Sequence, residues 1–142
     1  MKIRLLLLGK TRRAELHSLL DEYVKRIARS CPTEVTEVRD AAAALKKLDA
    51  DRAATAVLLD AGGKSYDSEG FAKWLRELRD RGTRELFFVC GDAEGFPQEL
   101  RERVKQKMSL SPMTYSHELA RVMLAEQLYR AFAILSGSPY PK

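Results

Sequence analysis

A neutral, proline-containing segment late in the chain carries the clearest chemical signal. Residues 110–117 read LSPMTYSH, with no acidic or basic side chain from Leu110 to Ser116. The segment offers apolar side chains, hydroxyl groups and backbone amides, which together suit a flat aromatic base with a sulfur- or carbon-rich tail. A surface loop with one buried methionine would have the same composition, so a ligand loop and a plain loop both stay open.

Two glycine-containing segments are the other candidates for contacting a ligand. The segment GDAEG at 91–95 lies between an apolar run and a helix pattern, where glycines let a ligand approach the backbone and the helix start exposes amides. A tight turn would explain the same residues. No GxGxxG motif is present, and GGKS at 62–65 lacks the first glycine of a phosphate-binding loop. A standard nucleotide fingerprint is therefore excluded.

These segments lie between strand patterns and helix patterns that alternate along the chain. Apolar or alternating runs predict strands at 3–8, 33–38, 55–60, 85–90 and 107–110. Periodic apolar residues predict helices at 16–27, 41–48, 71–78, 97–106 and 117–135. Ser68 is a predicted N-cap, Gly82 a C-terminal stop, and Pro97 a first helical residue.

The alternation predicts one compact α/β domain over 1–142 with a mostly parallel sheet. Ligands of such sheets collect at the carboxyl ends of the strands. Three loops, at 60–68, 91–96 and 110–117, follow strand ends, and we expect them to form the binding site.

Composition narrows the class of protein. The apolar fraction of 45% and the charged fraction of 32% are ordinary for a globular domain, and no apolar run reaches the ~18 residues of a membrane span. The opening MKIRLLLLGK is followed by GKTRR, so it is interpreted as a strand and not as a signal peptide. Two cysteines and two histidines show no disulfide framework and no metal-ligand spacing. We expect a cytoplasmic protein with no metal and no membrane contact.

Positive charge is concentrated near the N-terminus. The net charge is +5, and five cations precede the first acid, Glu15: Lys2, Arg4, Lys10, Arg12 and Arg13. This distribution is compatible with RNA or another polyanion as a partner, although many basic proteins bind no nucleic acid.

The last predicted helix is apolar on nearly all sides. Between Leu119 and Leu135 the strongly polar residues are Arg121, Glu126, Gln127 and Arg130. A surface helix of a small domain should carry a wide polar stripe, so this helix is expected to be buried on two sides. A second subunit is the simplest cover for the second side, which predicts a homodimer.

Four segments together resemble one enzyme family. LLDAGGKSYDSEGFA, FVCGDAEGF, LSPMTYSHELARVMLAEQLYRAF and SPYPK occur in that order. In this order they resemble the bacterial large-subunit ribosomal RNA pseudouridine N3-methyltransferases, a family of the SPOUT class. The resemblance covers essentially the whole chain and is most specific over 106–135.

The resemblance implies a fold, a cofactor and an assembly. It implies a C-terminal trefoil knot at approximately 85–142, a feature that rules of loop connection would not predict. It also implies a homodimer, and S-adenosyl-L-methionine bound in the knot. The implied substrate is 23S rRNA in the large subunit or the 70S ribosome. Transferred by motif, the cofactor contacts are Leu59, Gly91, Leu110, Ser111, Pro112, Met113, Thr114 and Tyr115.

The resemblance leaves the group that handles the proton open. An N3 acceptor must lose its imide proton to a base, or its anion must be stabilised. Family members usually end in Tyr-His, whereas this chain has Tyr140-Pro141, so Tyr140 is expected to position the target base instead. His117 and Arg121 are the other candidates for catalysis. A solvent-facing histidine and a structural arginine at a dimer seam are the alternatives.

Two further points concern RNA. Lys64 and Arg130, with the N-terminal cations, are expected to contact rRNA phosphates without selecting a sequence. Two other functions fit the same residues: a SPOUT methyltransferase acting on tRNA, and a non-catalytic RNA-binding dimer.

Overall fold

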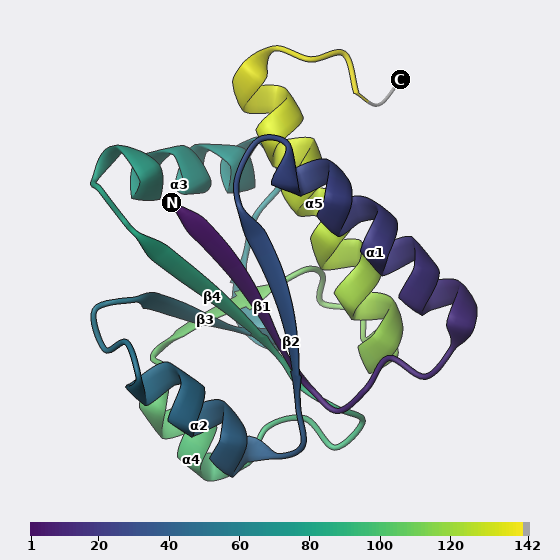
Figure 1. The fold of residues 1–142 in the computed structure, drawn as a ribbon, viewed down its shortest axis with the longest axis vertical. Helices are drawn as coiled ribbons and strands as arrows, with labels where there is room; N and C mark the ends of the chain where they lie inside the picture. Colours follow the sequence, from purple (N-terminus) through teal and green to yellow (C-terminus); the bar gives the residue numbers. More distant parts are fainter. Residues whose placement is uncertain (141–142) are drawn as a thin grey trace.

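The computed structural model describes residues 1–140 and shows strands alternating with helices (Figure 1). The strands are β1 (Lys2–Leu8), β2 (Thr33–Val38), β3 (Thr55–Ser65), β4 (Glu85–Cys90) and β5 (Gln106–Ser109). The helices are α1 (Ala14–Ala28), α2 (Ala41–Asp49), α3 (Ser68–Asp80), α4 (Gln98–Arg103) and α5 (His117–Ser136). The predicted order of elements is confirmed.

The strands form one sheet with the order β2-β1-β4-β3-β5, and each neighbouring pair within residues 1–140 is parallel. Leu5 of β1 lies opposite Val35 of β2 on one side and Phe88 of β4 on the other. Because every strand runs the same way, the carboxyl ends of β1, β3 and β4 meet at one edge of the molecule. The predicted parallel α/β sheet is therefore confirmed.

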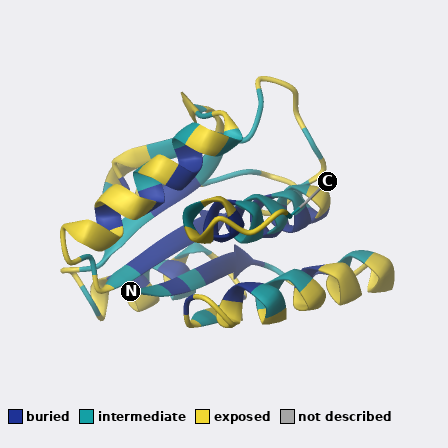
Figure 2. Cartoon of the chain, turned by 90° about the horizontal axis from the view of Figure 1, so that it is seen from above, coloured by how far each residue is buried: buried dark blue, intermediate teal, exposed yellow. Residues whose placement is uncertain are grey.

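Side chains of β1 alternate between two hydrophobic cores. Ile3, Leu5 and Leu7 belong to the core beneath α1, α3 and α5, while Leu6 and Leu8 belong to the core beneath α2 and α4. All five are at most 3% exposed, so the strand is buried on both faces as its continuous apolar run predicted. Burying one such side chain contributes about 1.5–3 kcal/mol. Figure 2 shows the buried residues in the sheet and on the helix sides that face it.

The segment predicted as a loop after β3 is largely strand. β3 continues to Ser65, and Met108 of β5 is paired both with Leu59 and with Lys64, so the residues between them form a bulge. A Cβ atom at Gly63 would lie 2.5 Å from the backbone carbon of Lys107. Glycine at this position permits a backbone approach that a side chain would prevent, which is why the turn-like GGKS sequence can continue β3 alongside β5.

Three helix boundaries also differ from prediction. α3 is capped by Asp67 and not by Ser68, because the Asp67 side chain accepts a hydrogen bond of 2.6 Å from the Gly70 amide. Pro97 is the N-cap of α4 and not its first residue, and α4 ends at Arg103. The early end frees residues 106–109 to pair with β3.

The apolar helix α5 lies between α1 and α3 on one face of the sheet (Figure 1). Leu124, Ala125 and Leu128 are fully buried in the core that these helices share. α1 and α3 thus cover two sides of α5 within one chain, while Leu119 and Ile134 of α5 remain 39% and 38% exposed. The homodimer that the apolar helix predicted is not tested by this single chain and stays a prediction.

Candidate active site

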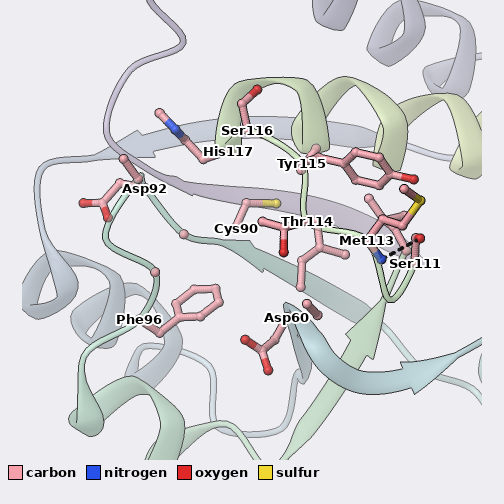
Figure 3. A pocket seen from close by; sticks show the side chains of 17 residues that line it. Asp60, Cys90, Asp92, Phe96, Ser111, Met113, Thr114, Tyr115, Ser116 and His117 are labelled. Atoms are coloured by element: carbon pink, nitrogen blue, oxygen red, sulfur yellow. Dashed lines mark hydrogen bonds between the residues drawn. The ribbon is translucent and has the colours of Figure 1, made fainter.

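A cavity of about 430 Å³ opens at the carboxyl end of β4, beside the bulge of β3 (Figure 3). Residues from three chain segments line it: 59–61 in β3, where its pairing with β4 ends, 90–96 at the end of β4, and 110–117 before and at the start of α5. This is the strand edge where parallel sheets bind ligands. Of the predicted loop 60–68, only Asp60 and Ala61 line the cavity.

Most of the predicted contact residues meet in this cavity. The lining includes Leu59, Gly91, Leu110, Ser111, Met113, Thr114 and Tyr115. Pro112 is not among the lining residues, and Met113 is 74% exposed at the rim. Of the predicted catalytic residues, His117 lines the cavity, whereas Arg121 and Tyr140 do not.

Serine hydroxyls shape the segment before α5. Ser109 is 3% exposed, and its hydroxyl donates to the Ser111 carbonyl at 2.8 Å and accepts from the Ser111 amide at 3.2 Å. The Ser111 hydroxyl accepts from the Met113 amide at 3.0 Å, and Ser116 caps α5 by accepting from the Leu119 amide at 3.3 Å. Hydroxyl bonds to nearby amides replace regular secondary structure here. The segment is therefore a defined wall without any charged side chain.

The wall after β4 depends on two glycines. The Gly95 amide donates to the Asp92 carbonyl at 3.0 Å, and Gly95 has φ +80°, in the left-handed region that favours glycine. A Cβ atom at Gly91 would lie 3.0 Å from the Gly95 carbonyl oxygen. Glycine at 91 therefore lets the turn fold back beside the strand end.

Several lining residues were not singled out from the sequence. Asp60 lies in the bulge of β3 with its Oδ1 atom 3.2 Å from Nη2 of Arg101, and the Arg101 guanidinium lies 5.9 Å from the ring of Phe96. Asp92 contributes a second carboxylate. An acid directly after a buried apolar run was the signal available for Asp60, because a carboxylate there must leave the core.

Cys90 also lines the cavity, and its thiol is buried. Burial raises the pKa of this thiol to about 12, which favours the protonated form. Because the reactive form of cysteine is the thiolate, this setting does not favour Cys90 as a nucleophile.

Arg121 lies inside the protein. It is 0% exposed, its Nη2 donates to the Leu8 carbonyl at 2.6 Å, and its Nη1 donates to the Thr11 hydroxyl at 3.0 Å. Burial lowers its pKa, while the nearby Glu118 opposes that shift. Both bonded partners belong to the same chain, so the geometry favours a structural role for Arg121 over a catalytic one. This role lies within one protomer and not at a dimer seam.

Tyr140 packs against α1 and α5. Its hydroxyl donates to Oε2 of Glu126 at 2.9 Å and lies 3.4 Å from the Tyr23 hydroxyl, and its ring centroid is 4.5 Å from that of Tyr129. Burial, followed by these two hydrogen-bond partners, raises the pKa of Tyr140. None of these contact residues lines the cavity. Pro141, on which the argument about the terminal histidine depends, lies outside the described residues.

Other kinds of site find no support in the described part of the chain. Over residues 1–140, no group of three His, Cys, Asp or Glu side chains is placed to hold a metal ion. Within the same residues, no helix is both long and apolar enough to cross a membrane.

Comparison with known proteins identifies relatives along the whole chain. A family model described as "Predicted SPOUT methyltransferase" matches residues 1–141. A protein of Koribacter versatilis named ribosomal RNA large subunit methyltransferase H is 41% identical over 142 residues, covering 99% of this chain and 97% of the relative. A protein of Gemmatimonas aurantiaca with the same name is 38% identical over 155 residues, with complete coverage of both.

Solved structures share the fold at low sequence identity. The tRNA (m1G37) methyltransferase from Aquifex aeolicus has a TM-score of 0.61 at 15% identity, covering 100% of this chain and 75% of that chain. The SpoU methyltransferase AviRb from Streptomyces viridochromogenes, solved with AdoMet, has a TM-score of 0.50 at 13% identity, covering 97% of this chain and 61% of that chain. These likenesses support the α/β fold.

Proposed function

The chain belongs to the SPOUT methyltransferase family, and on that premise we propose that it methylates N3 of a pseudouridine in 23S rRNA, with S-adenosylmethionine as methyl donor. The observation that carries the proposal is the convergence of the segments at 59–61, 90–96 and 110–117 on one cavity. Relatives that match the chain from end to end are named for methylation of the large ribosomal subunit RNA. The enzyme works in the cytoplasm, on the large subunit or the 70S ribosome.

The cavity suits the donor in size and chemistry. Its volume of about 430 Å³ lies within the ~300–1,000 Å³ usual for small-molecule sites. Leu59, Leu110 and Phe96 offer apolar walls for a purine, and the amides of Thr114 and Tyr115 offer donors for polar groups. Asp60 and Asp92 offer carboxylates for hydroxyl or ammonium groups. When bound, S-adenosylmethionine supplies an electrophilic methyl group.

His117 handles the acceptor proton. It lines the cavity at the first turn of α5, its side chain is 29% exposed, and its Nε2 lies 3.8 Å from Oε2 of Glu118. A neutral imidazole there accepts the N3 proton as the methyl group is transferred. His117→Asn should lower kcat by about 10²–10⁴, the range for general bases, and leave donor affinity unchanged. His17→Asn, on the exposed face of α1, is the matched control.

Tyr140 positions the target base. Tyr140 contacts residues outside the cavity of its own chain. It therefore reaches a target base either in the cavity of a second copy or after its hydrogen bond to Glu126 breaks. Tyr140→Phe removes the hydroxyl and keeps the ring. If stacking is the role, Tyr140→Phe retains activity and Tyr140→Ala loses it.

A homodimer completes the enzyme. A second cavity of about 490 Å³ lies among α1, α3 and α5, with Leu19, Tyr23 and Met123 in its lining. Leu19 is 39% exposed and lies with Tyr23 and Met123 in one apolar lining, which a second copy would cover. Leu19→Glu should shift sedimentation from dimer to monomer, whereas Lys25→Glu on the same helix should not. A monomeric wild-type protein at working concentration would contradict the dimer.

The family's trefoil knot extends over approximately 85–142, within a single domain of 1–142. The support is local: β5 pairs with β3, the segment 110–117 lines the cavity beside the ends of β3 and β4, and α5 then packs against α1. The C-terminal segment thus passes the strand ends before it returns over the sheet. An experimental structure that traces this crossing tests the knot.

One experiment separates the proposed function from its two rivals. Purified protein and isotope-labelled S-adenosylmethionine are incubated with 70S ribosomes, deproteinised 23S rRNA or bulk tRNA, and the labelled nucleoside is identified by mass. Label as 3-methylpseudouridine in 23S rRNA supports the proposal. Label confined to tRNA supports the tRNA methyltransferase instead. Absence of donor binding by calorimetry supports the non-catalytic RNA-binding dimer.

A further inference from the structure

The loop Gly9–Arg13 between β1 and α1 concentrates exposed positive charge. Lys10, Arg12 and Arg13 are exposed, whereas Thr11 between them is 6% exposed. Within residues 1–140, Lys10 and Arg12 make no salt bridge, and Arg13 meets Glu15 at 3.6 Å with both side chains at least 70% exposed. The loop therefore presents three solvent-exposed cations, and among the described residues Arg13 alone of the three has an ion-pair partner.

Three other cations singled out from the sequence are already ion-paired. Lys2 lies 2.8 Å from Glu34, and Arg4 lies 3.1 Å from Glu85, at the opposite end of β1. Arg130 lies 2.7 Å from Glu126, whereas Lys64 lies 5.1 Å from the Tyr66 ring centroid. An ion pair must be broken or shared before Lys2, Arg4 or Arg130 binds a phosphate, so the cations of the loop are more available than these three.

Four hydrogen bonds from or to side chains tie this loop and the adjoining end of β1 to the rest of the chain. Arg121 donates to the Leu8 carbonyl at 2.6 Å and to the Thr11 hydroxyl at 3.0 Å. The Arg13 amide donates to Oε1 of Glu118 at 2.9 Å, and the Thr11 amide donates to Oε2 of Glu37 at 3.0 Å. A fixed loop loses little conformational entropy when it binds, which favours affinity.

The bonds also place the loop beside the cavity. Arg121 and Glu118 belong to the first turns of α5, and His117 and Ala120 of the same turns line the cavity. The loop and the cavity therefore flank the start of one helix. Figure 1 shows the β1–α1 connection passing near that end of α5.

We propose that the loop Gly9–Arg13 is a clamp for the phosphate backbone of the substrate RNA beside the cavity, and that Arg121 is the positioning residue that holds it there. Guanidinium groups match phosphate oxygens in pairs, and a cluster of cations on a fixed backbone suits adjacent phosphates. The inference rests on the proposed function for its RNA substrate. It assigns the contact to a particular loop and gives buried Arg121 a role without substrate contact.

The test compares two triple variants that remove the same charge. Lys10→Gln, Arg12→Gln and Arg13→Gln are combined in the loop variant. The control combines Arg79→Gln, Arg81→Gln and Arg84→Gln, exposed residues at the other end of the sheet, where the Arg84 carbonyl accepts from the Lys2 amide. Binding to deproteinised 23S rRNA is measured at several salt concentrations, and donor affinity by calorimetry.

Each lost phosphate contact should reduce the slope of log affinity against log salt by about 0.7–0.9. The loop variant should lose about 2 units of slope and the control less than one, with donor affinity the same in both. Equal slopes in the two variants would overturn the clamp. The clamp would also be overturned if the loop variant bound deproteinised rRNA normally but bound ribosomes weakly. That result would mean that the loop contacts a ribosomal protein and not the RNA.

Arg121→Met tests the positioning role. It should weaken rRNA binding at a temperature where the variant is folded, and adding it to the loop variant should cause no further loss, because both act through one element. Additive losses would overturn the positioning role. If the loop variant loses salt dependence as expected but the wild-type protein transfers no methyl group, the clamp is supported and the proposed function is refuted.

Discussion

The stability of Arg121→Met is the sharpest prediction for the interior of the protein. Methionine approximates the length of arginine and removes the guanidinium, so the variant loses the bonds to the Leu8 carbonyl and the Thr11 hydroxyl. Hydrogen bonds to a charged group contribute about 1.5–3 kcal/mol each, and an unpaired buried carbonyl costs about 1–3 kcal/mol. Relief from burying a cation offsets part of this loss, since Nε of Arg121 has no partner in the described structure. We expect a net loss of about 2–3 kcal/mol.

Urea unfolding at fixed protein concentration measures this loss. The single tryptophan, Trp74, stacks on Phe71 with centroids 5.8 Å apart and is a natural fluorescence probe of the same core. With a slope near ~2 kcal/mol/M, the midpoint should fall by about 1 M. Arg130→Met, which removes a partly exposed pair on the same helix, should cost about 1 kcal/mol or less. A loss below about 1 kcal/mol for Arg121→Met would refute the structural role.

Three further predictions concern other parts of the chain. Gly63→Ala should weaken β3–β5 pairing by at least ~1 kcal/mol because its methyl group meets the Lys107 backbone, whereas Gly62→Ala should be tolerated; comparable urea midpoints would contradict this. The hydrogen bond from the Arg13 amide lowers the pKa of Glu118. Glu118 should therefore stabilise the protein relative to Glu118→Gln at pH 7, and this stabilisation should disappear as the pH falls below about 4. A difference in unfolding free energy that does not change with pH would contradict this prediction. Asp67→Ala removes the cap of α3 and should cost about 1 kcal/mol in thermal unfolding, with no change in donor affinity.

Local patterns were sufficient for the elements of the fold and for most of the cavity lining. The continuous apolar run at 3–8 reflects a strand buried on both faces, and the periodic leucines of α1 reflect burial that repeats every 3.6 residues; a sequence displays both directly. Parallel strands follow from the alternation with helices, and parallel strands bring loop segments to one edge. For this reason the loops 91–96 and 110–117 could be assigned to one site before their positions were known, whereas Leu59 was assigned only through the family resemblance.

Tertiary structure decided which charged residues are free and which apolar faces need cover. Lys2 and Lys10 look alike in the sequence, but parallel pairing of β1 with β2 brings Glu34 to Lys2 and leaves Lys10 exposed. Arg121 resembled a catalytic arginine because its partners Leu8 and Thr11 lie more than a hundred residues away in the chain. The all-round apolar α5 predicted cover on two sides, and only the packing showed that α1 and α3 supply much of that cover while Leu119 and Ile134 stay partly exposed. In each case the deciding contact joins residues distant in sequence, so it depends on the path of the whole chain and leaves no local pattern.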